Sequence, residues 1–401
     1  MAYKYERDKI MGTITNNKSA ILLIAALTLL ALSPAAFAYP PDNAAVLYYR
    51  ACQWHQSDSD MDKILSDLSK GKIEVDGKIK KYVRRNRRAI DFSITAAEVP
   101  NCDWGMDYSK GMSMVMPPLD TLRDLAELIV ADARILAGEG DYRSAFNRCL
   151  SLKRFARHVS DRPSLMYLVA YAMNSMSDKC IQDILPGISG DLETLSWLKE
   201  QLLQIESIPL SFRTCIDSSD ELLTSCMTSE TVKTQMAFAE GASPQIAEIA
   251  IDRIRSADEE FWSQNRKYWK NHIGSVRAAL DLPYPEASSR LDQLGDKPEK
   301  DAVENPDATL TAVFVSNFAG VYRIGARGKV RSNAVRAAVE VYIAQAKTGK
   351  LPDALPKDLP GDMFSGKPFM YEKTAEGFLL RCRAKDLSKD MIHEYEFKVA
   401  K

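Results

Sequence analysis

The sequence predicts a mainly α-helical protein that ends in a small antiparallel β-element. From residue 43 to residue 347, apolar residues recur at intervals of three and four, with prolines and glycines between the segments. After Leu351-Pro352 the apolar residues alternate instead with polar ones, which is the period of a strand. We therefore expect an array of antiparallel helical hairpins, followed by a three-stranded antiparallel β-element.

Residues 1–38 have the pattern of a secretory signal peptide. Basic residues precede an apolar run from Ala20 to Leu32, and Ala36-Phe37-Ala38 forms a small-x-small cleavage site. We expect cleavage near Ala38 and a protein that is periplasmic or extracellular. Two alternatives stay open: Met11 as the start, and an apolar segment kept as an anchor. No later stretch is long and apolar enough to span a bilayer, so we expect no transmembrane segment in the mature chain.

Residues 39–295 form the predicted helical domain. Two helices that follow Leu119 meet at Gly138-Glu139-Gly140-Asp141, where one ends and the next begins. This hairpin resembles a single tetratricopeptide unit. No second copy follows at a period of about 34 residues, so we expect tetratricopeptide-like packing without a true repeat. The later helices are predicted at Ser164–Leu185, Leu192–Glu206, Ser219–Phe238 and Gln245–Leu280.

Residues 296–307 are predicted to be a linker because the stretch is polar and rich in turn-forming residues. Residues 308–401 then form a second region. It begins with a long helix from about Ala308 to Lys347, which Gly349 and Pro352 end. Three short strands follow, and we expect one face of their sheet to pack against the long helix.

The composition is that of a globular protein with no general affinity for nucleic acid. The 401 residues are 46% hydrophobic and 27% charged, and their net charge is −1. A near-neutral chain does not attract a polyanion over its whole surface, so we expect no nucleic-acid partner. A charged partner must bind a local patch.

Three short motifs suggest an enzyme. Ser196-x-x-Lys199, Ser263-x-Asn265 and Lys347-Thr348-Gly349 follow one another as in penicillin-binding proteins, where a lysine activates a serine nucleophile. The alternative function is therefore a serine acyl-hydrolase that uses Ser196, Lys199 and Lys347. Against it, Ser196 lies mid-helix among leucines, and Lys347-Thr348-Gly349 has the composition of a helix end. We predict no catalytic residues.

The histidines and cysteines do not have the spacing of a metal or redox site. None of the four histidines has a partner four residues away, and none of the seven cysteines forms C-x-x-C. We therefore expect no metal and no cofactor. In an oxidising compartment, a disulfide could join Cys52 to Cys102. Cys215 and Cys226 could pair only if the helix between them is broken.

Two segments are candidate binding sites. The first is the basic run of residues 78–88, whose cations are Lys78, Lys80, Lys81, Arg84, Arg85, Arg87 and Arg88. After export it would bind anionic lipid or an acidic wall polymer, and the alternative is a solvated helix face that forms ion pairs with its neighbours. The second is the loop of residues 101–111, where Asp103, Trp104, Asp107 and Tyr108 would bind a sugar or a cation. The alternative there is a turn with a packed aromatic ring.

Several stretches resemble known proteins. "CDWGMDY", "LRDLAELIVADARILAGEGDYRSAF" and "LKRFARHVSDRPSLMYLV" resemble uncharacterised exported helical proteins of planctomycete-type bacteria. The tail "VRAAVEVYIAQAKTGKLPDALPKDLPGDMFSGKPFMYEKTAEGFLL" resembles the C-terminal part of the same group. It is also similar to the helix-to-sheet segment of type II secretion pseudopilins. The N-terminus departs from pseudopilins, since Pro34 and a cleavage site follow its apolar segment, so we do not expect filament assembly. The resemblance implies no activity.

These observations predict an exported helical binding or scaffolding protein without catalytic activity. Its partner would be a protein or an anionic surface of the cell envelope. The runner-up functions are the acyl-hydrolase and the anionic-surface binder described above.

Overall fold

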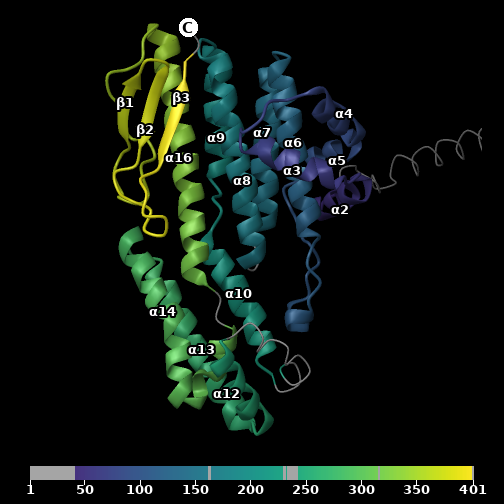
Figure 1. Ribbon diagram of the computed structural model, residues 1–401, viewed down its shortest axis with the longest axis vertical. Helices are drawn as coiled ribbons and strands as arrows, with labels where there is room; N and C mark the ends of the chain where they lie inside the picture. Colours follow the sequence, from purple (N-terminus) through teal and green to yellow (C-terminus); the bar gives the residue numbers. More distant parts are fainter. Residues whose placement is uncertain (1–40, 161–163, 229–231, 233–242, 315–316, 400–401) are drawn as a thin grey trace, which may run out of the picture. The chain divides into compact units, whose positions relative to one another are not determined.

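Helices form most of the described chain from Ala44 to Thr348 and a small sheet follows, as the computed structural model shows (Figure 1). The structure describes residues 41–160, 164–228, 232, 243–314 and 317–399. It confirms the predicted fold class, mainly α with a three-stranded antiparallel sheet near the C-terminus. The predicted signal peptide, residues 1–38, lies outside the described residues.

The first part of the chain folds into short helices followed by a long hairpin. The elements are α2 (Ala44–Trp54), α3 (Ser59–Ser69), α4 (Gly77–Arg85), α5 (Arg87–Ala97), a 3₁₀ turn (Tyr108–Ser113), α6 (Leu119–Gly138) and α7 (Tyr142–Ser160). The side chain of Asp76 accepts a hydrogen bond from the Ile79 amide and so caps α4. The predicted hairpin turn lies between α6 and α7, and Gly140 has the left-handed conformation there, with φ of 85°.

The remaining helices are α8 (Ser164–Ile184), α9 (Leu192–Glu206), α10 (Phe212–Cys226), α12 (Pro244–Arg255), α13 (Glu259–Ala279), α14 (Tyr284–Glu304), α15 (Thr309–Phe314) and α16 (Phe318–Thr348).

Two predicted helices are divided. Gln245–Leu280 is interrupted before α13, where Asp258 accepts a hydrogen bond from the Phe261 amide. The helix predicted from Ala308 is interrupted between α15 and α16, and Asn317 caps the start of α16.

The linker predicted at residues 296–307 is mostly helix, because α14 continues to Glu304 and a 3₁₀ turn, Pro306–Ala308, follows. Lys297 pairs with Asp301, and Lys300 pairs with Asp296 at 3.4 Å. Both pairs are four residues apart, which is the spacing that stabilises a helix. A polar composition therefore marked an exposed helix face here and not a linker.

The long helix α8 lies at the centre of the packing and contacts α6, α7 and α16. Glycines on α16 allow its close approach to α8. A Cβ atom at Gly325 would lie 2.6 Å from the hydroxyl of Tyr167, and one at Gly328 would lie 2.3 Å from the ring of Tyr171. Any larger residue at these positions would push the two helices apart.

The sheet follows α16 and packs one face against it (Figure 1). Strands β1 (Met370–Thr374), β2 (Gly377–Arg381) and β3 (Glu394–Lys398) are antiparallel, in that order across the sheet. Phe378 lies opposite Phe397, and its ring centre is 5.5 Å from that of Tyr342 on α16. Gly349 ends α16 in the left-handed conformation, with φ of 73°, as predicted.

None of the described helices combines the length and the hydropathy needed to cross a membrane.

Candidate functional site

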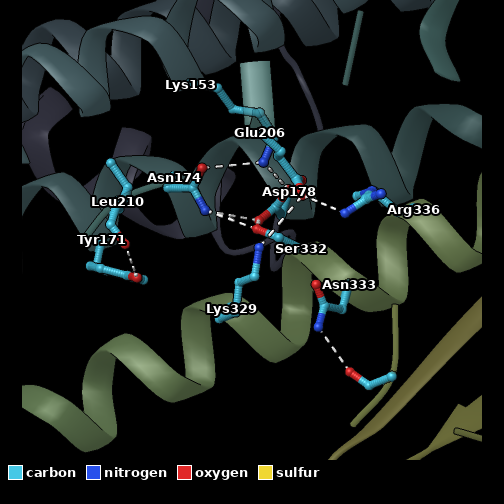
Figure 2. A network of polar contacts seen from close by, with 11 residues as sticks. Lys153, Tyr171, Asn174, Asp178, Glu206, Leu210, Lys329, Ser332, Asn333 and Arg336 are labelled. Carbon is cyan, nitrogen blue, oxygen red and sulfur yellow. Dashed lines mark hydrogen bonds and ion pairs between the residues drawn. The ribbon is translucent and has the colours of Figure 1, made fainter. Parts of the chain in front are cut away.

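A buried polar network joins α7, α8 and α16 (Figure 2). The ammonium of Lys153 lies 2.5 Å from Oδ1 of Asp178, and both side chains are almost fully buried, at 2% and 0% exposed. Ser332 donates a hydrogen bond to the other carboxylate oxygen of Asp178 at 2.5 Å. Asn174 accepts a hydrogen bond from Lys153 and donates to Asp178 at 3.1 Å. The carboxylate thus has a partner from each of the three helices.

Burial has the largest effect on the pKa of Asp178. It raises the pKa of Asp178, while the Lys153 ammonium and the Ser332 hydroxyl act in the opposite direction. A buried ion pair of this kind gains little net stability, but either charge without the other would be strongly unfavourable. The network therefore holds the three helices in one relative position.

A small cavity lies beside the network and is lined by Lys153, Asn174, Glu206, Lys329 and Ser332, among others (Figure 2). Its volume of about 40 Å³ suits a few water molecules and is far below that of a ligand site. Glu206 pairs with Arg336 at 2.9 Å, and its other oxygen is buried without a hydrogen bond from the described residues. We assign this cavity to structural water and not to a substrate.

A much larger cleft opens along another face of α8. Its volume is about 680 Å³, which lies in the range of ligand sites. Residues of α8, α16 and β3 line it, together with residues of α6 and the end of α3. Five of the lining side chains are cationic: Lys70, Arg123, Lys179, Arg327 and Arg331. No carboxylate is among the lining residues.

Carboxylates behind the lining hold three of the five cations. Lys179 pairs with Asp183 at 2.5 Å, and Arg123 lies 3.5 Å from Glu127. Arg327 lies 3.1 Å from Asp386, which is fully buried.

The other two cations, Lys70 and Arg331, have no ion pair within the described part of the chain. Lys70 donates a hydrogen bond to the Ser66 hydroxyl at 2.8 Å. The guanidinium carbon of Arg331 lies 5.4 Å from the ring centre of Tyr395. The charges of Lys70 and Arg331 are therefore the ones most available to a ligand.

His393 brings a further polar group to the cleft. Its Nε2 atom lies 3.1 Å from the carboxylate of Asp386. Burial alone would raise the pKa of Asp386, but hydrogen bonds from His393, Ser388 and Arg327 outweigh it and lower the pKa to about 2. Asp386 is thus ionised at neutral pH, and it fixes the orientation of both His393 and Arg327.

The predicted basic run, residues 78–88, lies on α4 and the start of α5, and part of its charge is already neutralised. Lys80 lies 3.8 Å from Glu139, and Arg85 lies 3.5 Å from Asp58. Arg87 makes a two-bond contact with buried Asp132, and Arg88 stacks 3.8 Å from the ring centre of Trp54. Lys78, Lys81 and Arg84 are left without an ion pair among the residues that the structure describes. Three of the seven cations of the run are therefore ion-paired and a fourth stacks on an aromatic ring, so only part of its charge is neutralised.

The predicted aromatic loop, residues 101–111, has structural contacts. Trp104 is buried, stacks on Tyr48 and donates a hydrogen bond to the carbonyl of His158 at 2.7 Å. Asp103 and Asp107 each accept a hydrogen bond from a backbone amide two residues later. The carbonyl of Tyr108 accepts a hydrogen bond from Ser225. These contacts give the loop a structural role, and they give no support to a sugar or cation site.

In the alternative enzyme, the serine and the first lysine would act together, but each contacts a different residue. The hydroxyl of Ser196 donates to the Leu192 carbonyl at 2.7 Å, and Lys199 pairs with Glu340 at 2.7 Å. Lys347 lies in the last turn of α16. No hydrogen bond joins Ser196 to either lysine in the described part of the chain, so this arrangement gives no support to an acyl-hydrolase.

The cysteines add no metal site. Helix α10 is continuous from Phe212 to Cys226, so Cys215 and Cys226 lie about 16 Å apart along it, too far for a bridge. Cys52 and Cys102 are both half-buried and both act to raise the pKa of Tyr49, after burial itself. Their disulfide stays a prediction. No group of three His, Cys, Asp or Glu side chains is placed to hold a metal among the described residues.

Sequence reasoning missed the cleft. Its residues come from five elements, run from Ser69 to Tyr395 along the chain, and form no motif. The one usable sign was an additional apolar stripe on α8, formed by Leu165, Leu168, Ala172 and Met176.

The chain was compared with protein-family models, with curated protein sequences and with solved structures, and none of these comparisons found a match. The resemblances to exported planctomycete proteins and to pseudopilins stay predictions.

Proposed function

We propose that this is a non-catalytic binding protein that takes an anionic ligand in the cleft between α8 and α16. The single observation that carries the proposal is the lining of the cleft, with five cationic side chains and no carboxylate. Carboxylates behind the lining pair with three of these cations, and Lys70 and Arg331 have no ion pair among the described residues, so an anion would find a complementary charge there. We further propose that the protein works after export, which rests on the signal-peptide pattern of residues 1–38.

The two arginines of the cleft favour a carboxylate or a phosphate as the anion. Arg327 and Arg331 lie one turn apart on α16 and both line the cleft. Guanidinium groups match the two oxygens of a carboxylate or phosphate, and each charge-assisted hydrogen bond contributes about 1.5–3 kcal/mol. The carboxylate of Asp386 already holds Arg327 in place, so little side-chain entropy is lost there on binding.

Titration with the anionic fluorophore 1-anilinonaphthalene-8-sulfonate (ANS) tests this function. We expect saturable binding that weakens about tenfold or more in the double variant Lys70→Gln and Arg331→Gln, because both cations lack an ion pair among the described residues. The matched control is Lys78→Gln with Lys81→Gln, which removes the same charge from α4 and should leave binding unchanged. Equal affinities for the wild type and the cleft variant would overturn the proposal.

A further inference from the structure

Two buried cysteines lie on successive helices, Cys149 on α7 and Cys180 on α8. Their side chains are 1% and 0% exposed, and both are free thiols in this structure. Neither belongs to a group of side chains placed to hold a metal in the described part of the chain. A buried cysteine can be no more than a small apolar side chain, but two that meet in the core can also form a covalent bond.

The packing of α7 against α8 brings the two cysteines to one level. Lys153 on α7 donates a hydrogen bond to Asn174 on α8. One turn earlier on α7, the carbonyl of Cys149 accepts a hydrogen bond from the Ser177 hydroxyl at 2.7 Å. The two helices are therefore antiparallel, and Cys180 lies within one turn of Ser177. Because a serine side chain is short, the two backbones approach closely here, as a disulfide requires.

The two sulfurs are neighbours. The pKa of the Cys149 thiol is raised, and a side-chain hydrogen bond with Cys180 is the largest cause, followed by burial. Arg134 on α6 lies near both thiols. Burial acts to lower the pKa of Arg134, and Cys180 and Cys149 are among the groups that raise it. Since the thiols contact each other, a bond between the sulfurs requires little movement of either helix.

We propose that Cys149 and Cys180 form a disulfide site, which joins α7 to α8 when the chain folds with an oxidant of the disulfide class present. The bond closes a loop that contains the end of α7 and most of α8. It lies one turn of α7 from Lys153, whose ion pair with Asp178 specifies the same packing. The covalent bond therefore restricts the unfolded chain and fixes the register of the two helices.

The reaction is thiol–disulfide exchange. One cysteine loses its proton, and its thiolate attacks a sulfur of the oxidant, which forms a mixed disulfide and releases one thiolate. The second cysteine loses its proton and attacks the protein sulfur of the mixed disulfide, which releases the other half of the oxidant. The two released thiolates take up the two protons. The cysteine pair thus loses two electrons, and the oxidant is reduced to two thiols.

Burial determines when this exchange takes place. In the folded protein the sulfurs are shielded from an oxidant, and the raised pKa of Cys149 leaves little thiolate. The disulfide therefore forms before α7 and α8 have closed over the sulfurs, and the folded protein then protects it from reductants. The oxidising compartment that residues 1–38 predict is one in which disulfides persist.

Peptide mapping of the full chain tests the site. The reduced chain is unfolded in urea and refolded with oxidised and reduced glutathione; free thiols are then blocked with N-ethylmaleimide, and the chain is digested with trypsin without reduction. We expect residues 149–153 and 180–199 in one species that separates on reduction, at least about tenfold more abundant than any other pairing of either cysteine. Recovery of both peptides with the blocking group, or joined to other cysteines, would overturn the site.

Two variants control for chance pairing. Cys149→Ala should abolish the linked species and leave Cys180 blocked. Cys215→Ala is the matched control, since Cys215 is also buried but lies on α10, and it should form the link as the wild type does. Equal loss of the link in both variants would contradict the assignment. The map of the wild type decides the question if Cys149→Ala does not fold.

Reduction of the linked protein tests its position in the core. Dithiothreitol should reduce the link at least about a hundredfold more slowly without urea than in urea, because the folded helices shield both sulfurs. Oxidised glutathione, treated in the same way, is the control for any direct effect of urea on the reaction. If the link is reduced equally fast in both conditions, it does not lie between α7 and α8 as proposed.

Discussion

The ion pair of Lys153 and Asp178 shows at residue scale how this protein uses buried charge. Water is excluded from both groups, so their mutual attraction mainly offsets the desolvation of each. Ser332 and Asn174 supply the remaining hydrogen bonds. The ion pair therefore specifies how the helices pack, because the two charges meet only when α7, α8 and α16 are in register.

Removing one charge of this pair should be costly. We expect Lys153→Met to lower the free energy of unfolding by about 3–5 kcal/mol, because it leaves the Asp178 carboxyl buried without its cation. Lys72→Met is the matched control, since Lys72 pairs with Asp67 at 3.1 Å on the surface, and it should cost about 1 kcal/mol or less. Urea denaturation measures both. Similar losses in the two variants would contradict this role of burial.

The carboxyl of Glu127 makes a pH-dependent contribution. Burial raises its pKa from 4.5 to about 7; Arg123 opposes this shift and Asp124 adds to it. Between these two values the folded state binds more protons than the unfolded state, so stability falls as the pH rises. Burial likewise raises the pKa of Asp124, to about 6, and this contribution has the same sign.

We therefore expect the urea midpoint of the wild type to fall between pH 5 and pH 7.5 through this contribution. The fall should be smaller in Glu127→Gln, which no longer titrates at that position. Glu248→Gln, on an exposed face of α12, should follow the wild type. Parallel curves for the wild type and Glu127→Gln would show that Glu127 is not buried as described.

At the scale of elements, the close contact of α8 and α16 depends on glycine. A Cβ atom at Gly328 would overlap the ring of Tyr171. We expect Gly328→Ala to destabilise the protein by about 1–3 kcal/mol, since the two helices must separate. Gly295→Ala is the control, because Gly295 lies inside α14 with open space around it, and that change should stabilise by about 0.5–1 kcal/mol. Thermal unfolding that shifts in the same direction for both variants would contradict the packing.

The sequence predicted those elements whose ends are encoded locally. Leu192–Glu206 was predicted with the bounds of α9, since Asp191 caps its start by accepting a hydrogen bond from Thr194. Gly349 likewise marked the end of α16. The two errors have different causes. At 245–280 the helical periodicity continues across a capped break. At 296–307 ion-paired polar residues on a helix resemble a linker.

At the scale of the whole molecule, the cleft could not be predicted from the sequence. Lys70 follows the end of α3, while Arg123, Lys179 and Arg331 lie on α6, α8 and α16, and only tertiary packing brings them to one cavity. The basic run of residues 78–88 was conspicuous in the sequence, but several of its cations already have partners.

The central claim is that the cleft between α8 and α16 is the ligand site. Hydrogen exchange, measured by mass spectrometry with and without saturating ANS, tests it most directly because a bound ligand suppresses local opening. We predict slower exchange in residues 165–179 and 324–331, with no change in residues 78–88. Slower exchange confined to residues 78–88, or no change in α8 and α16 at saturation, would contradict the claim.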